Sequence, residues 1–150
     1  MFKKMVFLLL SLCVLSNSHA FTCYVTLAKD SCWAHYATSI QVIDAASAKT
    51  IAKVSVPQGQ SWGRVSFPCQ TGQTISFSAK YSPSIWQGDQ GTSYASEQYI
   101  SLPAAVTPGS LAWNIPVCFS RDFSGVSIPP SATNRCACDF KSIPALRLKK

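Results

Sequence analysis

Six cysteines are the side chains in this sequence whose type and number point most directly to a chemistry. An even number of cysteines in an exported chain is typical of a disulfide framework, and six cysteines allow fifteen sets of three pairs. A seventh, Cys13, lies in an N-terminal segment that we expect to be removed. The six others are Cys23, Cys32, Cys69, Cys118, Cys136 and Cys138. We therefore expect three structural disulfides and no free thiol.

The spacing of the cysteines restricts their pairing only in part. Cys136 and Cys138 are two residues apart, so on an extended chain their Cα atoms lie about 6–7 Å apart, near the upper limit for a disulfide. We expect them to form two separate bonds that fix the C-terminal segment to the body of the protein. Cys23 and Cys32 are close enough in sequence to close a small loop. If these two pair, the remaining two cysteines take Cys136 and Cys138 in either order.

Metal binding and thiol redox chemistry are the alternative uses of cysteine. Zinc sites and thioredoxin-like redox sites favour two cysteines separated by two residues, and this spacing does not occur in the sequence. His35 is the only histidine after residue 20, so imidazole ligands are also scarce. We accordingly predict no metal site and no cofactor.

His35 is also the first candidate for a catalytic base, but its neighbours favour a structural role. It lies between aromatic residues in the segment 32–36, where we expect a packed, hydrogen-bonded side chain. Asp89 and Glu97 could form a glycosidase-like pair of carboxylates, although nothing in the sequence sets their separation. No phosphate-binding glycine loop and no nucleophile elbow occurs. We predict no catalytic residue and a protein that is not an enzyme.

Aromatic side chains on a long loop are the best candidates for a binding site. Ser82–Ser96 is predicted as a long polar loop, which holds Trp86, Gln87, Asp89 and Tyr94. Long ordered loops are often functional, and flat rings offer contact area to proteins and sugars at a small cost in entropy. We interpret the two aromatic residues as anchors, and Gln87 and Asp89 as polar contacts. In the alternative interpretation, Trp86 folds back and only covers the edge of the core.

Alternation of apolar and polar residues with a period of two predicts strands with one buried face. The clearest strand is Gln73–Tyr81, in which alternate residues fall on one face, namely Ile75, Phe77, Ala79 and Tyr81. No segment shows a sustained apolar stripe with helical spacing. Further strands are predicted over Phe21–Leu27, Ser39–Ile43, Thr50–Val56, Trp62–Phe67, Tyr99–Leu102 and Leu111–Ile115. Turn signals recur about every 8–12 residues, which is typical of β-sandwiches and barrels.

The run from Ile40 to Tyr81 resembles prealbumin-like sandwiches in its order of strand, turn and strand. The turn has the sequence DAASAKT, and the later strand has the sequence GQTISFSAKY. The resemblance implies a sandwich fold and transfers no site residue. We predict an all-β fold, a small disulfide-stabilised antiparallel β-sandwich of Ig-like or prealbumin-like type, with a barrel as the alternative.

The first twenty residues have the three parts of a signal peptide. Lys3 and Lys4 form a positive n-region, Met5–Leu15 is apolar, and small residues at Ser18 and Ala20 provide a cleavage site. The apolar run is shorter than the roughly 20 residues of a membrane span, so we predict no membrane span. We expect cleavage after residue 20 and export to the periplasm or the extracellular space.

Positive charge is concentrated towards the two ends of the sequence. The formal net charge is +7, and two of the lysines lie in the expected signal peptide. We divide the chain after the expected signal peptide into one domain over 21–146 and a basic tail over 147–150. Nucleic-acid binding requires basic residues clustered on one folded face, so we predict no nucleic-acid partner.

These observations favour an exported, non-catalytic binding or interaction module for an unknown protein or glycan partner. One alternative is a structural component of an envelope or secretion assembly. Another is a secreted enzyme inhibitor, which would present Ser82–Ser96 as a protruding loop, or a small hydrolase, in which His35 would meet a carboxylate in a cleft. The sequence leaves the oligomeric state open, although that state would help to separate the first two hypotheses.

Overall fold

A computed structural model describes residues 21–132 and 135–148 of the protein. The expected signal peptide over residues 1–20 lies outside the described residues, and so do the last two residues of the expected basic tail. Within the described ranges, no helix is long and apolar enough to cross a membrane.

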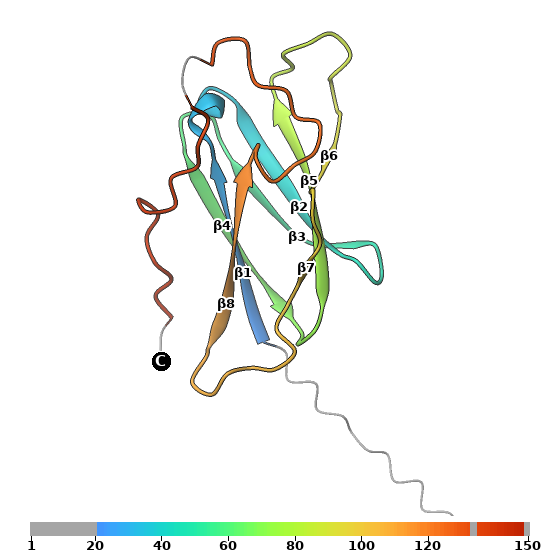
Figure 1. Cartoon of the computed structure of the whole chain (residues 1–150), viewed down its shortest axis with the longest axis vertical. Coiled ribbons are helices and arrows are strands. Elements are labelled where there is room, and N and C mark those ends of the chain that lie inside the picture. Colours follow the sequence, from blue (N-terminus) through green and yellow to red (C-terminus); the bar gives the residue numbers. More distant parts are fainter. Residues whose placement is uncertain (1–20, 133–134, 149–150) are drawn as a thin grey trace, which may run out of the picture.

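Two β-sheets pack face to face in an elongated sandwich (Figure 1). The elements in the described residues are β1 (Phe21–Lys29), the 3-10 helix η1 (Ser31–Trp33), β2 (Ala37–Asp44), β3 (Lys49–Val56), β4 (Trp62–Cys69), β5 (Thr74–Ser82), β6 (Tyr94–Ala95), β7 (Ile100–Ser101) and β8 (Ala112–Phe119). One sheet has the order β4-β1-β8, and the other has the order β3-β2-β5-β6, with β7 also paired to β5. The predicted all-β sandwich is confirmed, and the barrel alternative is wrong because the sheets do not close on each other.

β1 is the central strand of the three-stranded sheet. Cys23, Val25 and Leu27 are buried on its inner face, as their alternation predicts. β1 pairs antiparallel with β4 and parallel with β8, so that this sheet is mixed rather than wholly antiparallel. The parallel pair joins the first and last strands of the fold, which local sequence patterns do not reveal.

β5 is a central strand of the five-stranded sheet. Its alternate residues Ile75, Phe77 and Ala79 are all buried, which confirms the predicted inner face. β2 pairs with one edge of β5 along the length of the strand. The other edge of β5 pairs only with the two short strands β6 and β7.

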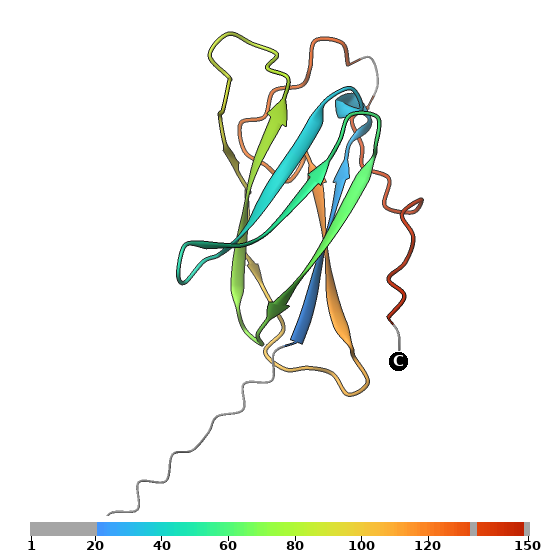
Figure 2. The same ribbon diagram turned by 180° about the vertical axis from the view of Figure 1, so that it is seen from behind.

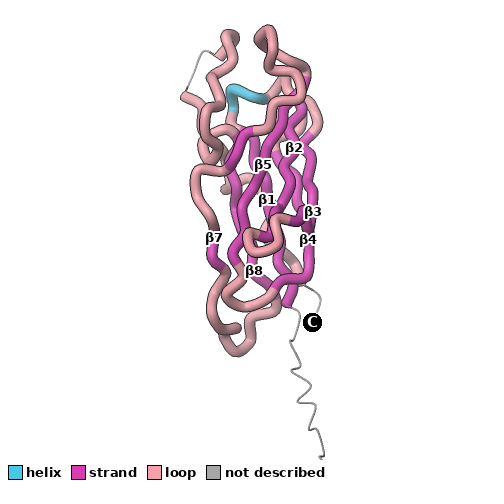
Figure 3. Tube along the Cα trace, turned by 90° about the vertical axis from the view of Figure 1, so that its right-hand side faces the viewer, coloured by secondary structure: helices cyan, strands magenta, loops and turns pink. Residues whose placement is uncertain are grey.

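The two long sides of the sandwich differ in how closely the sheets approach. On one side, which we call the closed side, a Cβ atom built on Gly63 of β4 would lie 2.8 Å from the carbonyl oxygen of Ser55 in β3, so the close approach requires glycine. On the other side, the open side, the sheets end in β8 and in the short strands β6 and β7 (Figure 1 for β6; Figure 3 for β7 and β8). No described strand pairs with the outer edge of β8.

Three disulfides use all six cysteines of the described chain. The pairs are Cys23–Cys69, Cys32–Cys136 and Cys118–Cys138. Cys136 and Cys138 form separate bonds, as predicted. The pair between Cys23 and Cys32 that the sequence left open does not form. The antiparallel register of β1 and β4 places Cys23 opposite Phe67, two residues before Cys69.

The sandwich has two ends that carry different loops (Figures 1 and 2). At the end that we call the loop end, β1, β3, β5 and β8 finish, and two of the disulfides, Cys32–Cys136 and Cys118–Cys138, lie nearby. The loop end comprises the segments 30–36, 57–61, 83–93, 120–132 and 135–138. The opposite end holds the third disulfide, the turn 70–73 and the loop 102–111.

Candidate functional site at the loop end

Asp89 organises the segment 83–93. Its Oδ2 atom accepts hydrogen bonds from the Tyr81 hydroxyl at 2.5 Å, from the N–H of Ile85 at 2.9 Å and from the N–H of Trp86 at 3.0 Å. Two of these donors are backbone groups of an irregular segment, which has no strand partner to accept their hydrogen bonds. One charged oxygen therefore ties the loop to Tyr81 near the end of β5 and fixes the backbone at Trp86.

The same contacts shift the ionisation of both partners. The hydrogen bond from Tyr81, assisted by those from the backbone of Trp86 and Ile85, lowers the pKa of Asp89 to about 2. Burial raises the pKa of Tyr81 well above its usual value, and the hydrogen bond to Asp89 raises it further. Asp89 is therefore a charged acceptor and Tyr81 a neutral donor throughout the neutral pH range.

Two of the four residues predicted as a contact site are accessible to a partner. Trp86 is 38% exposed, and Gln87 beside it is also exposed. Asp89 is half-buried, and its Oδ2 atom is used by the loop itself. Trp86 thus stands at the surface of a segment whose backbone is fixed from beneath by Asp89.

Tyr94, the fourth predicted residue, has a different environment. It belongs to β6, where it pairs with Ala79, and its half-buried ring stacks on Tyr81 with the centroids 5.7 Å apart. The prediction of a loop as far as Ser96 is therefore wrong for its last residues. The period-two pattern could not predict β6, because this strand has only two residues.

An aromatic cluster that sequence analysis did not identify lies beneath the loop end. Trp33 is fully buried at its centre, with ring centroids at 4.7 Å from Tyr81, 4.9 Å from Phe119 and 5.3 Å from Tyr36. Phe119 in turn contacts the buried Phe123. Such contacts between large rings stabilise a core beyond the area that they bury. The cluster gives the loops a rigid base, and its members come from three separate regions of the sequence, around residues 33–36, 81 and 119–123.

Lys29 joins two segments of the loop end from the inside. Its side chain is only 4% exposed, and its Nζ atom donates to the carbonyl oxygens of Tyr36 at 2.6 Å and Pro57 at 2.8 Å. Burial lowers the pKa of Lys29. The side chain therefore connects the segments 30–36 and 57–61 by charge-assisted hydrogen bonds.

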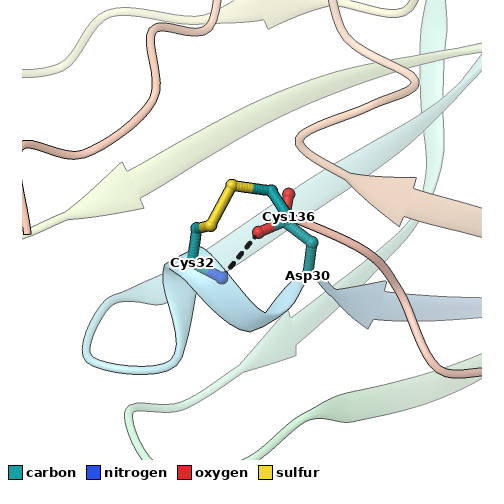
Figure 4. Close-up of side chains that lie close together, drawn as sticks. All are labelled: Asp30, Cys32 and Cys136. Atoms are coloured by element: carbon teal, nitrogen blue, oxygen red, sulfur yellow. Dashed lines mark hydrogen bonds between the residues drawn. A yellow bond between two sulfur atoms is a disulfide. The ribbon is translucent and has the colours of Figure 1, made fainter. Parts of the chain in front are cut away.

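Asp30, Cys32 and Cys136 lie together in an arrangement like that of metal ligands (Figure 4). Their candidate ligand atoms lie within 4.8 Å of one another. The two sulfur atoms are bonded to each other, however, so neither is the thiolate that a metal ion binds. The buried carboxylate of Asp30 accepts hydrogen bonds from the N–H of Cys32 at 2.9 Å and from the N–H and hydroxyl of Ser120 at 3.0 and 3.1 Å. The group forms a structural junction between η1 and the two segments that follow β8.

His35 lies on the surface of the loop end. It is exposed, and it makes no hydrogen bond or ion pair with a carboxylate in the part of the chain that the structure describes. The expectation of a packed, hydrogen-bonded side chain is therefore wrong. The neighbouring rings of Trp33 and Tyr36 take the inner positions and contact each other, which leaves His35 in the exposed part of the turn.

The loop end thus combines one accessible aromatic side chain with a rigid, disulfide-linked base. Comparisons with protein-family models, with curated proteins and with solved structures give no match for the chain. The interpretation of the site depends on its own geometry.

Proposed function

We propose that this protein is an exported, non-catalytic binding module whose contact surface is the loop end, with Trp86 and Gln87 as the central contacts. Asp89 and Tyr94 support this surface from within rather than contacting the partner first. The partner is a protein or glycan of the periplasm or the extracellular space.

The observation that carries this proposal is the accessible Trp86 on a backbone fixed by Asp89. Tryptophan is among the residues that contribute most to binding energy at interfaces, because a large ring buries much area. A segment that is already ordered loses little conformational entropy when a partner binds. A solvent-exposed indole on such a segment therefore suits recognition better than it suits stability of the free protein.

The disulfides support the exported location. Three disulfides are stable only where the compartment does not reduce them, which favours the periplasm or the extracellular space over the cytosol. The expected signal peptide supports the same location from the sequence.

A comparison of two double-site variants tests the proposed contact surface. The oxidised protein, its Trp86→Ala/Gln87→Ala variant and its Val106→Ala/Leu111→Ala variant are immobilised and exposed to envelope extracts and to a glycan array. The second variant removes exposed apolar side chains at the opposite end, where Val106 is 40% and Leu111 53% exposed. Any captured partner is then purified, and its affinity for all three proteins is measured by calorimetry.

We expect the loop-end variant to bind at least about tenfold more weakly, a typical effect of removing a central aromatic contact. The control variant should bind within about twofold of the original protein. Circular dichroism must show that both variants keep the fold. Equal affinity of the three proteins would place the contact surface elsewhere, and unfolding of the loop-end variant would show that Trp86 only covers the core.

A further inference from the structure

The outer edge of β8 presents backbone groups that no described strand uses. Cys118 directs its N–H and carbonyl away from β1, where they bond to the carboxylate and N–H of Asp122. Because alternate residues of a strand direct their backbone groups to the same edge, Ala112, Asn114 and Pro116 face the same way. Pro116 has no N–H, so the open part of the edge offers the N–H groups of Ala112 and Asn114 and three carbonyl oxygens.

A cavity of about 240 Å³ lies beside this edge on the open side of the sandwich. Phe77 and Ile100 from the five-stranded sheet and Pro116 and Val117 from β8 give it an apolar lining. Ser96, Glu97, Gln98 and Asp122 form its polar part. The edge and the cavity together provide what an added strand needs, namely backbone partners and a recess for a side chain.

The rim of the cavity carries an acidic group without a charged partner. Asp122 is already paired with Arg121, with Nε and Oδ1 2.7 Å apart. Glu97 is exposed, and it forms no ion pair with any residue that the structure describes. A segment that carries both apolar and basic side chains would therefore complement this surface.

Residues 146–150 of this chain carry side chains of both kinds. Leu146 and Leu148 alternate with Arg147 and Lys149, and Lys150 follows. The alternation is that of a strand with one apolar face. The described residues 144–148 nevertheless form no strand and pair with no other strand.

We propose that the β8 edge receives the segment 146–150 of a second copy of this chain as an added strand. Its leucine side chains enter the apolar cavity, and Lys150, which follows them on the same face of the added strand, lies near Glu97. The open stretch Ala112–Pro116 and the segment 146–150 are both five residues long. The resulting contact is heterologous, so it can link copies in a chain rather than only in closed pairs.

A peptide experiment tests the strand addition directly. The probe is the peptide of residues 145–150, acetylated and amidated, and the acceptor is the oxidised protein from which residues 146–150 have been deleted. Two modified peptides carry N-methyl groups on alternate sets of backbone amides. We expect the unmodified peptide to bind with a Kd below about 1 mM, as measured by NMR titration.

The N-methylated peptides distinguish strand addition from nonspecific attraction between charges. Only one alternate set of amides of an added strand faces β8. One modified peptide should therefore bind at least about tenfold more weakly, and the other should bind within about twofold of the unmodified peptide. Equal behaviour of the two modified peptides, or no binding of the unmodified peptide, would overturn the proposal.

Charge variants and the intact protein provide the second test. Glu97→Gln should weaken peptide binding about threefold, whereas Ser55→Lys, which makes the same change of net charge on the closed side, should leave it unchanged. The intact protein should associate with rising concentration in analytical ultracentrifugation, and a variant with residues 146–150 in scrambled order should not. A concentration-independent monomer whose tail resonances shift with Glu97→Gln would mean that the tail binds its own chain, and would overturn the link between copies.

Discussion

The two ends of the sandwich are formed by the same strands but hold their loops by different means. At the loop end, two disulfides, a buried aromatic cluster and the buried side chains of Lys29 and Asp30 fix the irregular segments. At the opposite end, Leu102 is the one residue of the loop 102–111 that is buried. Backbone hydrogen bonds such as that from Gly72 N–H to the carbonyl oxygen of Pro103 attach this loop to the turn 70–73.

The difference shows how irregular chain becomes ordered in a small β-protein. A strand supplies hydrogen-bond partners to its neighbours, whereas a loop needs partners from side chains. Asp30 and Asp89 supply them at the loop end by accepting hydrogen bonds from backbone N–H groups. The loop 102–111 has no comparable side-chain acceptor among its described contacts. We therefore expect recognition at the ordered end.

Reduction of the disulfides should have the largest effect. A bridge that closes tens of residues contributes on the order of 3–4 kcal/mol, whereas the whole free energy of unfolding of such a domain is about 5–15 kcal/mol. The three bridges here join cysteines 46, 104 and 20 residues apart. We expect full reduction to unfold most of the protein, as followed by circular dichroism.

Removing one bridge at a time distinguishes the contribution of the disulfides at the loop end from that of the disulfide at the opposite end. Cys32→Ser/Cys136→Ser should release the segments of the loop end, whereas Cys23→Ser/Cys69→Ser should leave their amide protection close to that of the original protein. Thiol titration of the oxidised protein should detect no reactive cysteine. Two or more reactive thiols in the absence of denaturant would contradict the disulfide assignment.

A pair of tryptophan substitutions compares the packing of the two ends. Trp33→Ala in the aromatic cluster should lower the free energy of unfolding by about 3–5 kcal/mol, because it leaves a cavity in a fully buried site. Trp113 is half-buried and contacts Phe21, with ring centroids 4.4 Å apart. Trp113→Ala should cost about 1–2 kcal/mol in urea unfolding. Equal losses would mean that the aromatic cluster does not distinguish the ends.

A substitution of Lys29 tests whether buried polar contacts stabilise the loop end. Lys29→Met keeps the apolar stem but leaves the carbonyl oxygens of Tyr36 and Pro57 without their donor. We expect a loss of about 2–3 kcal/mol in the free energy of unfolding. Lys53→Met, at an exposed position of β3, should change it by less than about 0.5 kcal/mol. Similar losses in both variants would show that the buried ammonium group makes no net contribution to the free energy of unfolding.

The smallest expected effect is a local change with pH at Asp89. The pKa of this carboxyl group is about 2 in the folded protein and about 4 in an unfolded chain. Its contribution to loop stability is therefore complete above pH 4 and is lost as the pH falls towards 2. The indole NMR signal of Trp86 should report this transition, and Asp89→Asn should abolish it. A signal that moves with the same midpoint in both proteins would exclude Asp89 as its cause.

The strands were predictable because their information is local. In β1 and β5 the alternation of apolar and polar residues identifies the buried face correctly. Thr26 is an exception, since it is polar and only 2% exposed. Its hydroxyl donates to Asn114 Oδ1 at 2.8 Å and accepts from Arg64 Nε at 2.7 Å. These partners are 88 and 38 residues away in the sequence, so no local pattern could indicate them.

The disulfide pairing depended on long-range information in the same way. Proximity in sequence allowed a pair between Cys23 and Cys32, whereas the register of β1 and β4 brings Cys23 close to Cys69. The exposure of Trp86 and Gln87 follows from their place in a polar, glycine-containing loop. The sequence does not indicate that Asp89 bonds within its own loop, because this requires the Tyr81 hydroxyl and two loop N–H groups to converge on one oxygen atom.

Amide hydrogen exchange tests most directly the claim that the loop end is preformed and the opposite loop is not. We predict that the N–H groups of Ile85 and Trp86 exchange much more slowly than those of residues 104–107 and 109, although both segments lie outside the strands. In Asp89→Ala this protection should disappear, while the amides at the centre of β5 exchange as before. Equal exchange of the two loops in the original protein, or protection that persists in Asp89→Ala, would contradict the account.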